Sequence, residues 1–183
     1  MPKGSRTLVL SWTKTKGAKG YDIYFAKCGK KFKKVRTIKG NKKFRWTKKN
    51  LKKKMSYKAY AKAWIKKGGK KKYISKTPVV HAYTFGGTKR YTNAKSVTVS
   101  KKNVSLLTGS KYEIVAKVNK LKKSKKLMNA AHTSGYKLRY RSSDPSIATI
   151  SKKGVISAKA KGRCKVYVFA HNGVRKTIQV TVK

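Results

Sequence analysis

The chain has 183 residues, of which 52 are Lys or Arg and only three are acidic, so its formal net charge is +49. A folded domain needs a net charge of only about 2–8 to stay soluble, so this excess predicts attraction to polyanions. Lys supplies 44 of the cations and Arg supplies 8. Because Lys is a hydrated point charge without the planar fork of Arg, this ratio favours diffuse attraction over recognition of one group. A hydrophobic content of 38% excludes a disordered basic tail.

No run of about 18 apolar residues occurs, so no transmembrane segment is predicted. The first six residues lack the apolar stretch of a signal peptide, which leaves an intracellular protein or a mature piece of a secreted one. The two cysteines, Cys28 and Cys164, lie 136 positions apart and do not indicate a disulfide scaffold. Cys28 lies in a predicted turn, where we expect it to be exposed, and Cys164 has the apolar parity of a core strand residue.

Apolar and polar residues alternate in short runs along the whole chain, separated by Gly, Lys-Lys or Asn turns. This period of two predicts β-strands, and no segment shows the period of a helix. In chain order the predicted strands are Thr7–Thr13, Tyr21–Lys27, Phe32–Ile38, Lys43–Thr47, Ser56–Ile65, Lys72–Tyr83, Ser96–Val99, Tyr112–Val118, Lys137–Ser142, Ile147–Ser151, Val155–Ala158, Cys164–Ala170 and Lys176–Val182.

Thirteen short strands are too many for one small sandwich. The fold class is therefore predicted as all-β, with two tandem antiparallel immunoglobulin-like β-sandwiches. The Gly pair at 86 and 87 marks the division, which gives a first domain at 1–85, a linker at 86–93 and a second domain at 94–183. Alternation predicts that the cores include Trp12, Ile23, Tyr57, Tyr140, Ile150 and Val166.

The first domain resembles a fibronectin type III module. Trp12 falls in the first predicted strand, Gly20-Tyr21-Asp22-Ile23-Tyr24 begins the next, and the segment from Leu51 to Tyr57 has the spacing of a tyrosine corner. The family's own first strand would have to precede Thr7, where only six residues remain. That strand is short or missing, truncated, or supplied by another chain. Repulsion between two chains of charge +49 nevertheless predicts a monomer.

The second domain is similar to the bacterial immunoglobulin-like group 2 module. The resemblance rests on the segments from Tyr140 to Ser151, from Gly154 to Ala158 and from Gly162 to Val166, which follow one another in register. A Lys-rich and then polar insert at 119–135 departs from the pattern. Both resemblances imply extracellular β-sandwiches of bacterial surface or secreted proteins, with no catalytic activity and no conserved ligand site.

The inventory of reactive side chains predicts no enzyme. Three acids in different segments do not suggest a carboxylate pair for acid–base chemistry. Neither cysteine has a readable His partner, and no HExxH or CxxC motif occurs, so no metal site and no cofactor are expected. The histidines that lack metal-ligand spacing are His81, His132 and His171. We expect Asp144 to cap a turn, and Asp22 and Glu113 to pair with cross-strand Lys.

The candidate binding residues are lysines concentrated in turns between strands. One such cluster is usually just solvated surface, but together they can engage spaced anions on a polymer. The predicted polyanion-binding residues are Lys30, Lys31, Lys33, Lys34, Lys48, Lys49, Lys52, Lys53, Lys54, Lys58, Lys62, Lys66, Lys67, Lys70, Lys71, Lys72, Lys122, Lys123, Lys125 and Lys126.

Aromatic residues alternate with some of these lysines. If Tyr57 points inward, then Tyr60 and Trp64 point outward, and Tyr24 lies on the same outer face. Such rings could stack on sugars or bases. Alternatively, they are good strand formers whose rings cover adjacent Lys stems.

The predicted partners are anionic polysaccharides, either host glycans or wall polymers such as teichoic acid. Nonspecific nucleic acid binding is expected in vitro through phosphate neutralisation, although no recognition helix or RNA-stacking motif is present. The resemblances place the protein outside the cell, secreted or at the cell surface. A passive spacer in a larger surface protein is the alternative.

Overall fold

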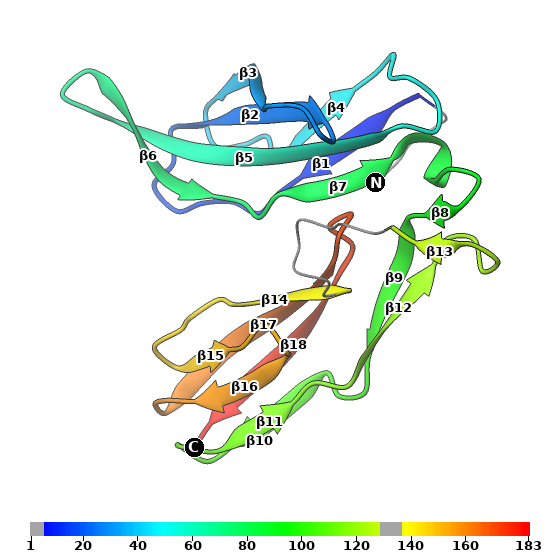
Figure 1. Cartoon of the computed structure of the whole chain (residues 1–183). Coiled ribbons are helices and arrows are strands. Elements are labelled where there is room, and N and C mark those ends of the chain that lie inside the picture. Colours follow the sequence, from blue (N-terminus) through cyan, green and yellow to red (C-terminus); the bar gives the residue numbers. More distant parts are fainter. Residues whose placement is uncertain (1–5, 129–136) are drawn as a thin grey trace. The chain divides into compact units, whose positions relative to one another are not determined.

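The computed structural model describes residues 6–128 and 137–183, in which nearly all regular structure is strand (Figure 1). The chain divides into two compact units, Met1–Lys89 and Arg90–Lys183. The all-β prediction is confirmed. Residues 129–135 of the expected insert, and His132 within it, lie outside the described residues.

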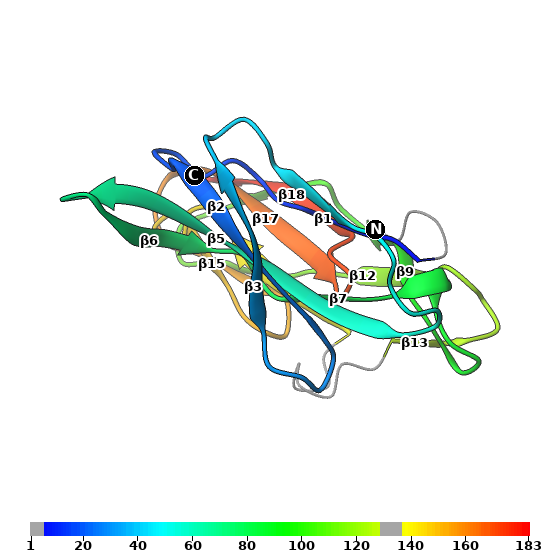
Figure 2. The ribbon, with the colours of Figure 1, turned by 90° about the horizontal axis from the view of Figure 1, so that it is seen from above.

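The first unit contains seven strands and a short 3₁₀ turn at Thr84–Gly86. Its strands are β1 (Leu8–Ser11), β2 (Gly20–Lys27), β3 (Lys33–Lys39), β4 (Arg45–Lys48), β5 (Ser56–Lys67), β6 (Lys70–Lys76) and β7 (Val80–Tyr83). One antiparallel sheet has the order β3-β2-β5-β6, and β7 pairs with the other half of β5. The β5 and β6 strands form a long hairpin (Figures 1 and 2), closed by Gly68 and Gly69 at positive φ, while β1 pairs with β4.

The last strand predicted in this unit, Lys72–Tyr83, is in fact two strands. Pro78 has no N–H to donate to a neighbouring strand. At this point the hydroxyl of Thr77 accepts a hydrogen bond from the Ala61 N–H at 3.0 Å. A side chain thus takes the place of a backbone acceptor, and the pairing with β5 resumes at β7.

The core of the first unit forms from alternate residues of β2 and β5. Tyr21 and Ile23 are 1% and 0% exposed, and three alanines of β5 pack against them. These small side chains leave room for larger apolar side chains, including that of Trp12, which is partly buried against the cluster. Ile23 and Tyr57 are buried as predicted.

The predicted tyrosine corner is present. The Tyr57 hydroxyl accepts a hydrogen bond from the Lys52 N–H at 3.1 Å, and the Tyr57 ring is buried with Leu8 and Leu51. Ahead of β1, Arg6 is bonded to Leu51 through its backbone carbonyl and its Nε. Neither Arg6 nor Thr7 belongs to a strand, and the preceding residues are not described.

The described residues of the second unit form eleven strands, several of them very short. They are β8 (Tyr91–Thr92), β9 (Ala94–Val99), β10 (Asn103–Leu106), β11 (Lys111–Glu113), β12 (Ala116–Lys120), β13 (Lys126–Leu127), β14 (Leu138–Ser142), β15 (Ala148–Ile150), β16 (Val155–Ala158), β17 (Gly162–Ala170) and β18 (Arg175–Val182). The main sheet has the order β10-β18-β17-β14, with β10 parallel to β18, and a second sheet has the order β11-β16-β15. The pairs β12-β9 and β13-β8 complete the unit.

The core of the second unit lies between these sheets. Val166 is 0% exposed, whereas Tyr140 and Ile150 are partly buried against the cluster. Cys164 is 5% exposed, so its predicted core position is confirmed.

Trp12, Trp46 and Trp64 are the chain's three tryptophans, and none lies in this unit. Tryptophan fluorescence therefore reports on the first unit alone.

We expect Tyr57→Phe to destabilise the first unit by about 1 kcal/mol, because the Lys52 N–H loses its acceptor while the ring still packs. Urea unfolding followed by tryptophan fluorescence measures the change. Tyr60→Phe is the matched control, since its ring is also buried and no hydrogen bond of its hydroxyl is found in the described parts of the chain. Equal losses of unfolding free energy in Tyr57→Phe and Tyr60→Phe would contradict a stabilising role of the tyrosine corner.

We also expect residues 1–89 and 90–183 to fold when each is expressed alone, because each has its own buried core. Each fragment should give a β-type circular dichroism spectrum and a cooperative thermal transition. A fragment without such a transition would show that its core depends on the other unit.

Candidate functional site

The strongest gathering of charged and aromatic side chains lies on one face of the β3-β2-β5-β6 sheet. Side chains of a strand alternate between its two faces, so Asp22 and Tyr24 point away from the core that holds Tyr21 and Ile23. Tyr60 and Trp64 of β5 also point away from it. We call this surface the outer face of the first unit.

Aromatic rings on the outer face pack on one another. The rings of Tyr24 and Tyr60 are stacked, with centroids 4.7 Å apart and an angle of 7° between planes. Phe32 meets Tyr60 edge to face at 4.7 Å. Trp64 lies over Gly20, where a Cβ atom would collide with the indole ring. Only Gly at this position allows the ring to lie flat on the sheet.

Four lysines extend over these rings. The Nζ atoms of Lys58, Lys71 and Lys76 lie 4.5, 4.6 and 4.4 Å from the ring centroids of Phe32, Trp64 and Tyr60 respectively. Lys62 lies between two rings, 4.7 Å from Tyr73 and 5.3 Å from Tyr24. Each such contact stabilises by about 0.5–1 kcal/mol at an exposed site. The rings therefore fix the positions of the cations.

This arrangement corrects the prediction that Tyr24, Tyr60 and Trp64 offer free surfaces for stacking. Tyr60 and Trp64 are only 7% and 5% exposed, and Tyr24 is half-buried. They lie on the predicted face, but neighbouring rings and lysines cover them. The alternative interpretation, in which rings cover Lys stems, describes the outer face better.

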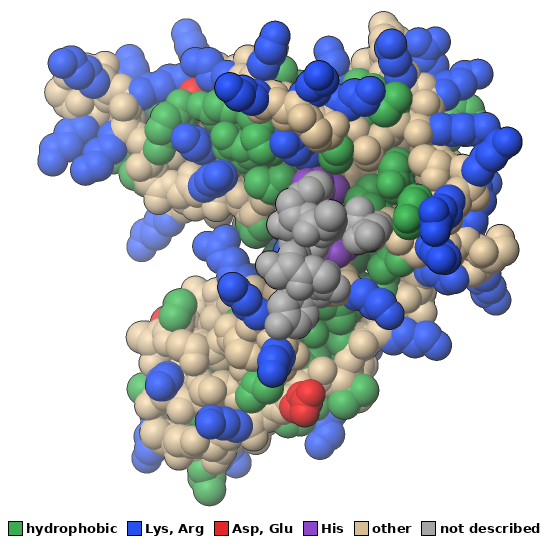
Figure 3. Space-filling view, in the orientation of Figure 1, with side chains coloured by type: hydrophobic (Ala, Val, Ile, Leu, Met, Phe, Trp, Pro, Cys, Tyr) green, Lys and Arg blue, Asp and Glu red, His purple; other side chains and the backbone are tan. Residues whose placement is uncertain are grey.

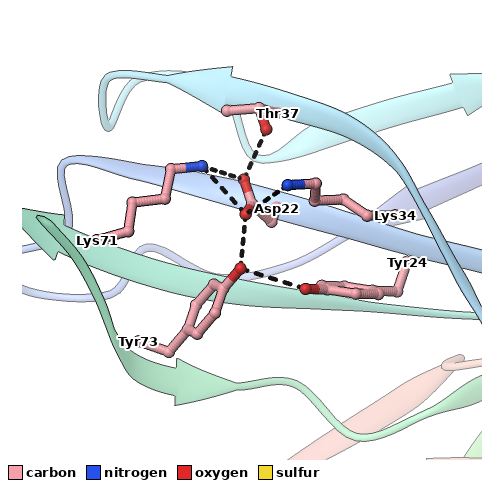
Figure 4. A network of polar contacts seen from close by, with 6 residues as sticks. All are labelled: Asp22, Tyr24, Lys34, Thr37, Lys71 and Tyr73. Carbon is pink, nitrogen blue, oxygen red and sulfur yellow. Dashed lines mark hydrogen bonds and ion pairs between the residues drawn. The ribbon is translucent and has the colours of Figure 1, made fainter.

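Asp22 lies at the centre of the outer face with its side chain fully covered (Figure 4). Lys71 Nζ donates to both carboxylate oxygens, at 2.9 and 3.1 Å. The hydroxyls of Tyr73 and Thr37 donate at 2.7 and 2.8 Å, and Lys34 Nζ lies 4.0 Å away. Asp22 is thus the acceptor that ties β2, β3 and β6 together across the face.

The surroundings of Asp22 shift the acidity of two groups. Burial opposes the charge of the Asp22 carboxylate, but hydrogen bonds from Lys71, Tyr73 and Thr37 outweigh it and lower its pKa below the ordinary value of 3.8. The pKa of Tyr73 is raised, first by its hydrogen bond with Tyr24, then by burial and by Asp22. Tyr73 donates its proton to Asp22, and the hydroxyls of Tyr24 and Tyr73 lie 3.2 Å apart.

The structure brings only some of the predicted lysines together. Lys34, Lys58, Lys62 and Lys71 gather on the outer face, whereas the remaining ones lie in turns or near the ends of strands. In the view of Figure 3, Lys and Arg side chains are spread around the visible face of each unit. All the predicted lysines are exposed except Lys58, Lys62 and Lys125, which are half-buried. They form separate clusters and not one continuous site.

Sequence reasoning missed Phe32, Thr37, Tyr73 and Lys76 as members of the outer face. The alternation of Lys71 with Tyr73 in β6 was the available signal. However, a register shift between Ala63 and Trp64 decides which residues of β6 lie beside Lys62 and Trp64 of β5. The prediction that Asp22 pairs with lysine is confirmed. Its direct cross-strand neighbours are Thr37 on β3 and Lys62 on β5, whereas its ion-pair partners are Lys71 and Lys34.

The other two acids differ from each other. Asp144 Oδ1 accepts hydrogen bonds from the Ser146 hydroxyl at 2.6 Å and from its N–H at 3.0 Å, which confirms the capped turn. The hydroxyl bond, followed by the N–H bond, lowers the Asp144 pKa. Within 6–128 and 137–183 the ion pairs found are those of Asp22, so the pairing expected for Glu113 is not seen.

Cys28 is half-buried and not exposed as predicted, with its Sγ 3.6 Å from Nδ1 of His81. Burial raises the pKa of the Cys28 thiol, so the thiol stays protonated at neutral pH and is a poor nucleophile. Among the described side chains, no three of His, Cys, Asp or Glu converge as they would around a metal ion. No helix in the described part of the chain is long and apolar enough to cross a membrane.

Residues 93–182 match the sequence profile of the family described as Bacterial Ig-like domain (group 2). Comparison with curated proteins gives no match. Similar solved structures include domains 4 and 5 of the S-layer protein SbsC, with 18% identity, a TM-score of 0.39 and coverage of 67% of this chain and 64% of that one.

Two further structures are similar. The C-terminal 282-residue fragment of intimin, in complex with the intimin-binding domain of the translocated intimin receptor, has 16% identity and a TM-score of 0.35, covering 97% of this chain and 57% of that one. A two-domain fibronectin type III segment of chicken tenascin has 13% identity and a TM-score of 0.34, with coverage of 96% and 91%. The chain spans less than two-thirds of the SbsC and intimin fragments.

We expect Asp22→Asn to destabilise the first unit by about 2 kcal/mol at neutral pH, because a charged acceptor of three donors is lost. The folded-state pKa of Asp22 lies below 3.8, so its contribution is complete above that pH and is lost as the pH falls through the folded-state pKa. The difference in unfolding free energy between parent and variant should therefore become smaller in strongly acidic solution. Urea unfolding at several pH values, followed by tryptophan fluorescence, measures it.

Asp144→Asn is the charge-matched control, since Asn also caps such turns and residue 144 lies in the other unit. It should leave the tryptophan-detected transition unchanged. A constant difference between parent and Asp22→Asn from pH 7 down to pH 2 would contradict the assigned role of the carboxylate.

Proposed function

We propose that the chain is a non-enzymatic, polycationic extracellular protein that binds anionic polymers, because residues 93–182 match the bacterial Ig-like family (group 2) and the chain carries a net charge of +49. Acidic or sulfated glycans and wall teichoic acid are the proposed partners, and nucleic acid is a nonspecific one. The protein acts at the bacterial surface or after secretion.

One observation carries this proposal: the cations have almost no internal counter-charges. The chain has three acids against 52 Lys and Arg, and the ion pairs found in the described residues are those of Asp22 with Lys34 and Lys71. Unpaired like charges on one surface raise the energy of the folded protein, and an external polyanion lowers it. Since each contacted anion releases condensed counterions, many weak contacts add up to substantial binding at low salt.

The arrangement of the lysines supports a polymer ligand over a single small one. Clusters such as Lys52–Lys54 and Lys122–Lys126 project from different turns of both units. Lys58, Lys62, Lys71 and Lys76 are held over rings, which reduces the side-chain entropy that binding would cost. A long chain of spaced anions can reach several clusters at once.

A passive spacer in a larger surface protein is the second candidate. The covered rings of the outer face favour it, because Tyr60 and Trp64 already have their partners within the unit. On this alternative, the cation–aromatic contacts serve only to stabilise the sheet.

We expect the protein to be retained on immobilised heparin and on purified bacterial wall at low salt, and to elute as ionic strength rises past about 0.15 M, where the Debye length is about 8 Å. Changing Lys53 alone to Gln should shift elution little. Changing Lys52, Lys53 and Lys54 together should shift it clearly, and on duplex DNA should reduce the salt slope by about 0.9 for each lost contact.

The control is the same triple change to Arg, which keeps the charge and should keep the elution position. If the parent stayed bound in molar salt, or if one Lys change abolished binding at low salt, the protein would have a specific site in place of distributed contacts. If neither matrix retained the parent at low salt, the spacer function would be supported.

A further inference from the structure

The end of the β5-β6 hairpin is a projecting ribbon of two strands that is rich in lysine (Figures 1 and 2). Pairing of β5 with β2 ends at Trp64, which lies opposite Gly20, and beyond this point β5 continues in its pairing with β6. The ribbon residues 66–72 include five lysines, and all seven residues are exposed. We call residues 65–72 the ribbon.

Two glycines form the tip of the ribbon. Gly68 and Gly69 have φ values of 56° and 72°, and two consecutive positive values are typical of the type I′ turn that suits the twist of a hairpin. A Cβ atom at either position would have no neighbour within 4 Å. The tip is therefore narrow and carries no side chain, while lysines flank it on both strands.

The lysines of the ribbon lie on both of its faces. Residues directly opposite one another on paired strands share a face, and successive residues alternate between faces. Lys66 is opposite Lys71, and both lie on the outer face. Lys67 is opposite Lys70, and both lie on the reverse face together with Lys72. In the view of Figure 3, Lys and Arg side chains lie on both sides of the hairpin end.

This arrangement brings like charges together. Like charges directly opposite each other destabilise a strand pair. Asp22 compensates Lys71 by accepting two hydrogen bonds from its Nζ, at 2.9 and 3.1 Å. The ion pairs found in 6–128 and 137–183 do not include Lys66, Lys67 or Lys70. Anions placed against both faces of the ribbon would relieve this repulsion.

We propose that the ribbon enters the major groove of B-form duplex DNA with its tip first. This inference rests on the proposed binding of polyanions and deepens it, because it makes duplex DNA a partner selected by shape. Phosphates line both walls of a groove, and the ribbon carries cations on both faces. A single glycan chain, in contrast, lies against one face of a ribbon.

The dimensions of the ribbon agree with the major groove. Packed sheets lie about 10 Å apart, so a ribbon with its side chains is about 10 Å thick. It fits a major groove about 12 Å wide, whereas a minor groove about 6 Å wide is too narrow. Residues 65–67 extend about 10 Å beyond the last pair with β2, which is close to the groove depth of about 8.5 Å.

Two consequences distinguish this contact from diffuse attraction. Lysine offers a point charge without a planar fork, so contacts to phosphates place the ribbon without reading the base sequence. The major groove of A-form RNA is deep and narrow, and side chains do not enter it. Duplex RNA of the same sequence should therefore gain little from the ribbon.

The first test compares two variants of equal charge on a DNA duplex of about 16 base pairs, on the same duplex in RNA and on heparin. The ribbon variant changes four lysines to Gln but keeps Lys71, which belongs to the Asp22 network. Its affinity for DNA at about 0.1 M salt should fall about hundredfold, and that of the control variant about tenfold. On RNA and heparin the two variants should lose alike. The ribbon variant changes Lys66, Lys67, Lys70 and Lys72, and the control changes the exposed Lys48, Lys49, Lys52 and Lys53.

The groove itself is tested by competition with dyes and by NMR. Methyl green, which occupies the major groove, should displace the parent protein from duplex DNA, whereas netropsin, which fills the minor groove, should not. Titration with the duplex should shift the ¹H–¹⁵N signals of residues 66–72 more than those of other Lys-rich turns. Displacement by netropsin and not by methyl green would overturn the assignment to the major groove.

A variant that preserves charge tests the shape of the ribbon. Changing Gly68 and Gly69 to Val distorts the turn, because branched side chains disfavour positive φ. Affinity for DNA should fall about fivefold, while elution from heparin should not change. The matched control changes Gly29 and Gly40 to Val, since both also have positive φ and open space around Cβ. It should keep the parent's affinity for DNA, and thermal unfolding verifies that each variant is folded.

The outcomes separate the ribbon from the proposed function. Equal losses of DNA affinity in the ribbon and control lysine variants would overturn the ribbon contact while polymer binding stands. A larger loss in the ribbon variant on heparin or RNA as well would do the same, because the ribbon would then act as charge alone. A parent that bound neither heparin, bacterial wall nor DNA at low salt would overturn both proposals.

Discussion

The protein must fold while carrying 52 cations against three acids, and this imbalance shapes the first unit in particular. Lysine side chains there have almost no carboxylates to pair with. Aromatic rings take that role, since the negative face of a ring attracts an ammonium group without removing it from water. The single acid of the unit, Asp22, accepts hydrogen bonds from three side chains at the centre of the outer face. The long stems of the lysines cover the rings, so charge and apolar burial occur on the same surface.

Much of the fold could be predicted because alternation with period two directly encodes which residues face the core. Ile23, Tyr57 and Val166 are buried for that reason. The tyrosine corner was also predictable, because its spacing is local. The break between β6 and β7 was not, because it depends on the Thr77 hydroxyl finding the Ala61 N–H from another strand. Strands of two residues, such as β8 and β13, are too short to show any period.

The candidate site was predictable in composition but not in arrangement. The sequence places Tyr60 and Trp64 on the correct face, yet their exposure depends on which residues of β6 lie alongside, and a register shift after Ala63 decides this. Gly20 allows Trp64 to lie flat, and nothing near residue 64 in the sequence indicates that contact.

Distributed charge and side chains with fixed positions act over different distances, which is why both can operate in one protein. Attraction between a polycation and a polyanion extends to about a Debye length, about 8 Å at physiological ionic strength, and is insensitive to which lysine makes the contact. It raises the local concentration of polymer without selecting its chemistry. Selection requires groups whose positions are set before the ligand arrives. On the outer face, rings hold Lys58, Lys62, Lys71 and Lys76 in place, so these lysines meet that requirement, whereas the lysines that project from turns do not.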